Sequence, residues 1–399
     1  ECTLLAGGPD ACAGKLGAVA ERRTPYGTLT PGGYRKRTTA DYDEELCLDP
    51  GQVVAFVQAT QPQEWAKLRR QYGDRARARF LKRLSREIAK RGTLGVLREG
   101  VKDMGATIRL VYFKPPTGLN PDLQEKYLAN RFSVIRQLTY SVKDKDKRHR
   151  KALDLAIFLN GLLLFTAELK NPLTGQSYRD AIHQYKTTRD PQEPLFAQGR
   201  CLAHFAVDPD QVWFTTALAG RDTVFFPFNR GRGRGRGNPP AGPGSFATAY
   251  LWEDVWAEDT VLRLLEQFVH VIDLRDEAGR KTGEQRIIFP RYHQLDTVRR
   301  LTAHARERGP GERYLIQHSA GSGKSFTIAW LAHQLTTLHD AADAAIFDTI
   351  VVVTDRRVLD RQLQRHVRNF QQIRGLVQNI DRGSHQLQGA LEAGKRIVV

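Results

Sequence analysis

The chain has 399 residues, of which 41% are hydrophobic and 9% aromatic, an ordinary composition for a globular protein of two or three domains. Its 61 lysines and arginines outnumber 44 aspartates and glutamates, and the formal net charge of +17 makes a polyanion such as nucleic acid the obvious partner class. No apolar run approaches the roughly 18 residues of a membrane span, and the N-terminus lacks the layout of a secretory signal, so we expect a cytoplasmic protein that does not contact a membrane.

Four cysteines, Cys2, Cys12, Cys47 and Cys201, are spread along the chain. They form no Cys-x-x-Cys pair and match no histidine spacing that suggests zinc, so we interpret them as reduced thiols. The chain opens on glutamate rather than methionine and closes on the apolar, strand-like Arg396–Val399. From these two ends we expect a fragment of a longer protein.

The first half changes from a helical to a strand-like pattern. Residues 1–50 show weak periodicity, whereas Gln52–Glu99 has a helical pattern with long basic runs, which we interpret as a solvated helix face in preference to a DNA-contacting one. Short apolar segments then predict strands, with one helix at 178–189 between them, and together they indicate a mixed α/β core. The expected strands are 107–113, 153–159, 162–169, 202–207 and 212–216.

An Arg-Gly repeat at 229–237, followed by a Pro-Gly stretch to residue 244, is the low-complexity segment of the chain. Such a composition cannot form a core, and we favour a flexible surface loop over a dedicated nucleic-acid-binding element. We therefore expect an N-terminal domain at 1–228, a loop or linker at 229–246, and a second, partial domain at 247–399.

The second half alternates helices and strands after two leading helices at 252–271 and 292–308. The alternation predicts a parallel sheet. Its expected elements are a strand at 314–317, a helix at 324–338, a strand at 349–354 and a helix at 358–370.

Between the first strand and helix of this alternation lies His318-Ser-Ala-Gly-Ser-Gly-Lys-Ser325, the context that a phosphate-binding loop requires. Gly321 and Gly323 let backbone N–H groups, including that of Ser322, point at phosphates, Lys324 adds a positive charge, and the Ser325 hydroxyl can bind Mg²⁺. We therefore expect ATP and Mg²⁺ as cofactors; a chance Gly/Ser turn before a lysine is the alternative.

This loop resembles that of superfamily 2 helicases and translocases, although His318 stands where the strict pattern has glycine. The resemblance implies a RecA-like domain in which Gln294 reads adenine and Arg356 and Arg357 contact the DNA backbone; Gln294 as ordinary surface and the arginines as a helix entry are the alternatives. Such motors also need an acidic Asp-Glu motif and arginines from a second domain. Neither is present up to Val399, so we expect this chain to hydrolyse ATP hardly at all.

A second constellation places charges inside apolar strands, with Asp154 in one and Glu168 and Lys170 in the next. Alternate strand residues share a face, so Glu168 and Lys170 point the same way. Asp154 joins them if a three-residue turn, or an equivalent bulge, sets it opposite Glu168; a two-residue turn alone would set it opposite Ala167.

Two converging carboxylates are suited to Mg²⁺, and a nearby lysine can orient a metal-activated water, which is the chemistry of phosphodiester hydrolysis. A glutamate and a lysine at strand edges with solvent-facing tips are the alternative reading. We therefore expect Asp154 and Glu168 as metal ligands and Lys170 as a catalytic residue.

Residues 153–189 resemble the PD-(D/E)xK nuclease of the restriction subunit of type I restriction-modification enzymes. The resemblance rests on Asn160-Gly161, Ala167-Glu-Leu-Lys-Asn-Pro172, Thr174-Gly-Gln176 and Asp180–Tyr185. Further matching stretches are 59–62, 95–100, 204–208, 226–229 and 250–253. Relatives carry a Gln-x-x-x-Tyr pair after the Glu-x-Lys motif. The resemblance implies that Gln184 is the glutamine of this pair and a catalytic residue. At the tyrosine position this chain has Thr188, and its tyrosine, Tyr185, directly follows Gln184 instead.

The resemblance implies a nuclease followed by the first part of a motor, acting with modification and specificity subunits on double-stranded DNA. It would translocate duplex DNA at the expense of ATP and cut both strands, with Mg²⁺, far from the recognition site. The alternatives are a nuclease-helicase of another system, such as type III restriction or DNA repair, and a non-catalytic DNA-binding scaffold.

Overall fold

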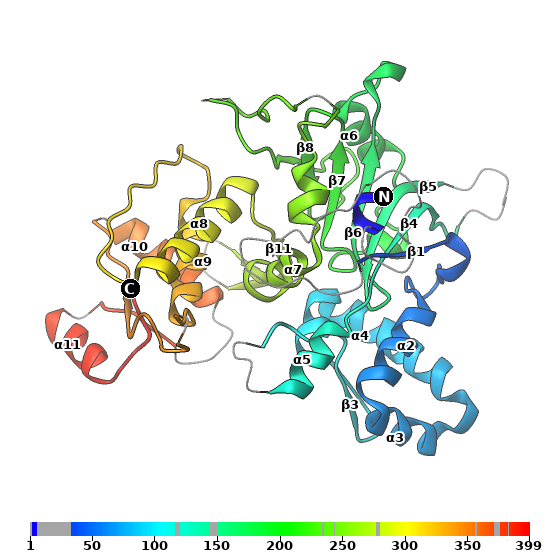
Figure 1. Cartoon of the computed structure of the whole chain (residues 1–399), viewed down its shortest axis with the longest axis horizontal. Helices are drawn as coiled ribbons and strands as arrows, with labels where there is room; N and C mark the ends of the chain where they lie inside the picture. The colour runs from blue at the N-terminus through cyan, green and yellow to red at the C-terminus, as the bar shows by residue number, and fades with distance from the viewer. Residues whose placement is uncertain are drawn as a thin grey trace. The chain divides into compact units, whose positions relative to one another are not determined.

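The computed structural model describes residues 2–5, 33–115, 120–143, 151–233, 235–242, 244–276, 280–340, 342–355, 357–370, 376–381 and 383–399. They divide into two compact units (Figure 1). The first comprises Glu1–Val271 and Glu284–Phe289, and the second Ile272–Gly283 and Pro290–Val399.

A seven-stranded mixed sheet, in the order β1-β4-β5-β6-β7-β8-β9, organises the first unit (Figure 1). β1 pairs with β4 and β6 with β7 in parallel, and the other neighbours are antiparallel. The side chains of β6 are buried on both faces along nearly its whole length, which explains its continuous apolar run. The expected mixed α/β core is confirmed. The strands are β1 (Arg35–Arg37), β4 (Phe132–Thr139), β5 (Ala152–Leu159), β6 (Leu162–Leu169), β7 (Ala203–Val207), β8 (Val212–Thr215) and β9 (Phe226–Pro227).

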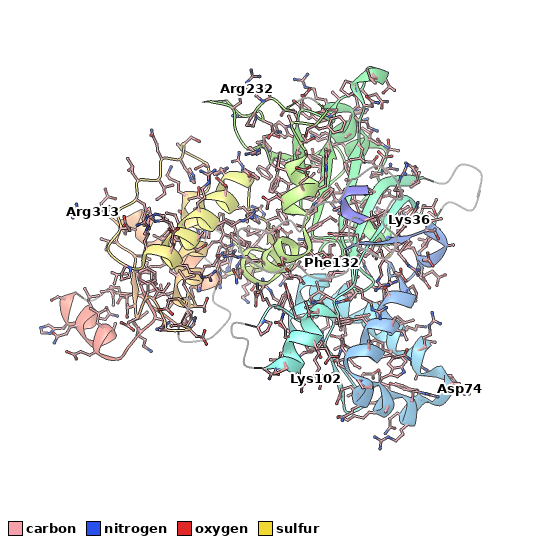
Figure 2. The ribbon with its side chains drawn as sticks, viewed as in Figure 1. Lys36, Asp74, Lys102, Phe132, Arg232 and Arg313 are labelled. Carbon is pink, nitrogen blue, oxygen red and sulfur yellow. The ribbon has the colours of Figure 1, made fainter. Side chains whose placement is uncertain are left out.

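Three helices of this unit, α2, α5 and α6, begin at a side-chain cap. The Asp49 side chain accepts a hydrogen bond from the Gln52 N–H at the start of α2, and Ser177 and Asp180 form a capping box at α6. The turn between α3 and α4 contains Asp74, labelled in Figure 2. The helices are α1 (Cys2–Leu5), α2 (Pro50–Thr60), α3 (Pro62–Tyr72), α4 (Ala76–Glu99), α5 (Pro121–Leu128), α6 (Tyr178–Thr187) and α7 (Glu258–Arg263).

Two expectations for this unit are corrected. The strand expected at 107–113 is short, because only β3 (Ala106–Ile108) pairs with β2 (Val101–Asp103), and the Gln61 carboxamide then bonds both the N–H and the carbonyl of Arg109. The helix expected at 252–271 is broken into α7 and two π-helical turns, η6 (Leu251–Val255) and η7 (Leu264–Phe268). The Arg98 guanidinium donates hydrogen bonds to the carbonyls of Leu265, Glu266 and Val269, the last carbonyls of this helical segment.

The first unit continues past the boundary expected from composition. Tyr34 donates to the Trp256 carbonyl and Tyr250 to the Phe228 carbonyl, so residues after 246 belong to the same packed body. The described part of the Arg-Gly segment is likewise folded back, since Asn238 bonds the Arg230 N–H and the Asp210 carbonyl. Compactness therefore divides the chain near Val271 rather than at the low-complexity segment.

The second unit contains a small parallel sheet in the order β12-β14-β13, as the alternation predicts. The two-stranded sheet of β10 (His270–Arg275) and β11 (Lys281–Ile288) lies in the part of the chain where the units divide. The remaining elements are α8 (Tyr292–Arg308), α9 (Lys324–Thr336), β12 (Ile350–Val351), α10 (Arg357–Asn369), β13 (Val377–Gln378), α11 (Ser384–Glu392) and β14 (Ile397–Val398).

The strand expected at 314–317 is wrong. These residues have no regular secondary structure, and the Leu315 side chain is 96% exposed. An extended segment becomes a strand only when a neighbour pairs with its backbone, and no strand within the described ranges does so here. The strand expected at 349–354 is reduced to the two residues of β12 for the same reason, since only these pair with β14.

Among the residues that the structure describes, no helix is both long and apolar enough to cross a bilayer. Cys47 and Cys201 are buried free thiols, as expected, and burial raises the pKa of Cys201 to about 12. Cys12 and the Cys2 side chain lie outside the described residues.

Candidate active site

The β5–β6 hairpin aligns the two carboxylates. Asn160 and Gly161, both at positive φ (50° and 81°), form a two-residue turn, so the expected three-residue turn is wrong. A bulge between Ile157 and Phe158 then shifts the register so that Leu155 faces Ala167, which brings Asp154 level with Glu168. The alternative expectation of an equivalent bulge is confirmed.

The turn is held by its neighbours rather than by its own sequence alone. Asp49 donates its N–H to the Gly161 carbonyl at 2.9 Å, and a Cβ at Gly161 would lie 2.4 Å from the Asp49 carbonyl oxygen. The Asn160 side chain bonds the Arg131 N–H and the Leu110 carbonyl. The hairpin turn is thus packed against the start of α2, where only glycine fits.

Glu168 is fully buried and paired with an arginine that the sequence analysis did not single out. Arg189 Nε and Nη2 donate to Glu168 Oε1 at 2.9 and 2.6 Å, and Arg189 also bonds the Ala152 carbonyl and the Tyr140 hydroxyl. Glu168 Oε2 is buried without a hydrogen-bond partner. Burial raises the pKa of Glu168 to about 7; Arg189 opposes this rise and the Asp154 carboxylate adds to it.

Asp154 lies between two strands that fix both of its oxygens. Its Oδ2 accepts the Leu169 N–H at 2.8 Å, and its Oδ1 accepts Gln137 Nε2 at 3.0 Å. Gln137 is on β4, interrupts the β4–β5 ladder and has a φ of 49°, a conformation that costs about 1–2 kcal/mol outside glycine. The sequence analysis missed Gln137 because it did not predict β4.

Lys170 follows β6 and is held by α6. Its Nζ donates to Gln184 Oε1 at 2.6 Å, so these two expected site residues are in direct contact. Tyr185 is different, because its side chain is fully buried in the hydrophobic core and its hydroxyl shares the Thr166 Oγ1 with His204. It lies inside the protein rather than beside the lysine.

This arrangement fits a hard divalent cation. Glu168 Oε2 is a buried oxygen without a partner, and Asp154 supplies a second carboxylate next to it. Among the described residues, no group of three or more His, Cys, Asp or Glu side chains is placed to hold a metal ion. Two carboxylates completed by water are a ligation that Mg²⁺ accepts.

The glycine-rich loop in the second unit is curled as a phosphate-binding loop requires. Gly321 and Gly323 have φ of 72° and 81°, and α9 begins at Lys324. Lys324 Nζ donates to the carbonyls of His318 and Ser319 at 3.1 and 3.0 Å. Ser325 lies in the first turn of α9, half-buried.

Gln294 supports this loop directly. It is buried in the first turn of α8, where Oε1 accepts the Arg291 N–H and Nε2 donates to the carbonyls of Ser322 and Gly323 at 3.2 and 3.0 Å. Gly323 has a φ of 81°, which favours glycine, and a Cβ there would also displace the Gln294 carboxamide, whose Nε2 lies 2.6 Å from that position.

The remaining expected contacts are only partly described. Arg356 lies outside the described residues, and Arg357 is the first residue of α10, with its side chain outside the description. His293 was not expected here, but its Nε2 lies 3.1 Å from the Ser322 carbonyl and burial lowers its pKa to about 4.

Two family models match the chain. The type I restriction enzyme R protein N terminus matches residues 41–223, and the SWI2/SNF2 ATPase matches residues 293–399. The first range contains the carboxylate pair, and the second contains the glycine-rich loop.

Two curated proteins are similar to this chain over part of its length. The putative type I restriction enzyme MjaVIIIP endonuclease subunit of Methanocaldococcus jannaschii is 26% identical over 223 residues, which is 52% of this chain and 19% of that protein. The type I restriction enzyme HindI endonuclease subunit of Haemophilus influenzae is 27% identical over 252 residues, which is 60% of this chain and 21% of that protein. The chain thus spans about a fifth of the length of these relatives.

Proposed function

We infer that this chain, whose residues 41–223 form the N-terminal region of a type I restriction enzyme R protein, contains the DNA-cleaving site of a restriction endonuclease subunit. The observation that carries the proposal is the register of the β5–β6 hairpin. It sets Asp154 beside Glu168 and leaves one buried Glu168 oxygen without a partner.

The proposed fold of this site is a PD-(D/E)xK nuclease core, with Asp154 and Glu168 holding Mg²⁺. When bound, the ion would lower the pKa of a coordinated water and offset charge on the scissile phosphate of double-stranded DNA. Arg189 binds one Glu168 oxygen and so directs the other toward the cation. Gln184 holds the Lys170 ammonium in place, where it can orient the nucleophile and stabilise the developing negative charge.

The second part of the proposal is a RecA-like motor that consumes ATP. The loop 321–325 would cradle the phosphates, with Lys324 leaving the carbonyls of His318 and Ser319 to meet them and Ser325 binding the Mg²⁺ of the nucleotide. Gln294 would read adenine only if its Nε2 left Ser322 and Gly323, which would couple nucleotide binding to the loop. The similarity of 293–399 to SWI2/SNF2 ATPases supports this part.

For the whole protein we propose a type I restriction subunit that works with modification and specificity subunits. It would translocate duplex DNA and cleave it far from the recognition site. The first compact unit would carry the nuclease and the second the first part of the motor, with Arg356 and Arg357 touching the DNA backbone.

The test introduces two lysine substitutions, one at a time, into the whole restriction subunit proposed above and compares the complexes reconstituted with modification and specificity subunits. We expect Lys170→Ala to abolish DNA cleavage, by a factor of about 100 or more, while ATP hydrolysis continues. Lys324→Ala should abolish both activities. Lys102→Ala, which removes an exposed lysine of β2, is the control and should retain both. Normal cleavage by Lys170→Ala would refute the nuclease assignment.

A further inference from the structure

The outward face of α4 is a continuous basic stripe. Arg79, Lys82, Arg83, Arg86 and Lys90 are all exposed and recur every three or four residues, so they share one side of the helix. From Arg79 to Lys90 this α4 basic stripe extends about 16 Å along the helix axis at 1.5 Å per residue. The helix starts just after Asp74, labelled in Figure 2.

The opposite face of α4 is buried, and its apolar side chains are sufficient to hold the helix against the core. Phe80, Leu84 and Ile88 pack into the core at i, i+4 and i+8. Lysine and arginine are not needed for that packing. Any polar residue would serve on the outward face, so the uniform positive charge calls for another explanation.

Most cations of the stripe have no acidic partner, unlike other exposed cations. Glu87 pairs with Arg83 and with Arg91, but Arg79, Lys82, Arg86 and Lys90 make no hydrogen bond or ion pair with any residue that the structure describes. By contrast, on other helices Lys67 pairs with Glu64 and Arg300 with Asp296.

Like charges at i, i+3 and i, i+4 each destabilise a helix by about 0.2–0.5 kcal/mol. The stripe contains several such pairs, for example Lys82 with Arg86 and Arg86 with Lys90. An arrangement that weakens the isolated helix becomes favourable when a polyanion neutralises it.

We propose that the α4 basic stripe is a second DNA-contacting surface, which binds the phosphate backbone of the duplex that the proposed nuclease site cleaves. The choice of duplex DNA as the partner rests on the proposed function. The residues of the stripe are independent of the nuclease site, because the stripe belongs to α4 and the site to β4, β5, β6 and α6. The stripe anchors the duplex by charge and independently of sequence.

Duplex DNA fits the stripe better than an acidic protein does. Protein interfaces have a buried apolar centre, whereas none of the large exposed hydrophobic side chains of the described residues lies on α4. A row of exposed cations along one helix face, of which only Arg83 pairs with a described acidic residue, instead suits a partner that carries a regular row of negative charges.

The test measures binding of the whole chain to a fluorescent 30-base-pair duplex of arbitrary sequence, in EDTA, over a series of salt concentrations. The stripe variant is Lys82→Gln/Arg86→Gln/Lys90→Gln. The control variant, Lys102→Gln/Arg109→Gln/Arg221→Gln, removes the same charge from exposed positions outside α4. Thermal unfolding verifies that both are folded, and loss of like-charge repulsion should make the stripe variant no less stable.

We expect the slope of log K against log [salt] to fall in magnitude by about 2.7 in the stripe variant, which corresponds to three lost phosphate contacts, and to change little in the control. Equal slopes in the two variants would overturn the inference while leaving the nuclease proposal intact, since EDTA removes cleavage from the measurement. Failure of the unaltered chain to bind duplex at all would contradict both. Binding of an acidic peptide in place of DNA through the stripe would also overturn it.

Discussion

At the residue scale, the candidate active site depends on side chains that do no chemistry themselves. Glu168 is buried with an unpartnered oxygen, a costly state that Arg189 offsets by binding the other oxygen twice. Gln137 has a left-handed backbone conformation, and its side-chain Nε2 donates a hydrogen bond to Asp154. Both residues restrict the carboxylates to one orientation before any cation arrives.

Arg189→Met should destabilise the first unit by roughly 3–5 kcal/mol at about pH 9, above the Glu168 pKa of about 7, because it removes the counter-charge of a buried carboxylate. Urea unfolding at that pH measures this loss, which should shrink as the pH falls through 7 and the carboxyl becomes protonated. Adding Glu168→Gln to the same chain should restore much of the stability, since the uncompensated charge is then absent.

The matched control is Lys186→Met, which removes a half-buried cation of α6 that has no hydrogen bond or ion pair with a described residue. Its free energy of unfolding should change by less than about 0.5 kcal/mol. Similar losses in the two variants would mean that Arg189 contributes packing rather than charge compensation.

At the element scale, the β5–β6 hairpin decides the site. Its tight Asn160–Gly161 turn taken alone would set Asp154 opposite Ala167, on the wrong face, and the bulge at Ile157/Phe158 corrects the register by one residue. The apolar runs of β5 and β6 predict the strands, since buried strands need apolar residues on both faces. Those runs do not specify the bulge.

Gly161→Ala should disrupt this hairpin. An added Cβ would lie 2.4 Å from the Asp49 carbonyl oxygen, in a backbone with φ of 81°. An alanine in a left-handed conformation costs about 1–2 kcal/mol by itself, so we expect the free energy of unfolding to fall by well over that amount. Gly175→Ala is the control, because Gly175 has a similar φ of 72° and nothing within 4 Å of its Cβ position.

Urea unfolding compares the two glycine variants, and duplex cleavage by the reconstituted complex provides a second readout. Gly175→Ala should lose only the free energy that an alanine costs at a positive φ, and its complex should still cleave DNA. If both variants lost the same free energy, the close approach of α2 to the hairpin would not contribute to its conformation.

At the scale of the whole molecule, the chain contains two compact units, each with its own buried residues. We expect urea unfolding to show two transitions rather than one. Gly161→Ala should lower the midpoint of one transition, and Gln294→Ala, which removes three hydrogen bonds around the glycine-rich loop, should lower the other. A single transition that both variants shift would contradict two independent units.

The sequence by itself determined the mixed α/β class, the positions of β5, β6, α8 and α9, and the residue types of both sites. These follow from local periodicity and from motifs whose members are close in the chain.

Only the tertiary structure decided which residues complete the candidate site and where the units divide. Arg189 reaches Glu168 from the segment after α6, Gln137 reaches Asp154 from the neighbouring strand, and the unit boundary depends on bonds such as that of Tyr34 with Trp256. The segment 314–317 is apolar enough for a strand but has no partner. The physical reason is common to all these cases: a hydrogen bond or salt bridge between residues distant in sequence leaves no local pattern, so it is set by the register and packing of the whole fold.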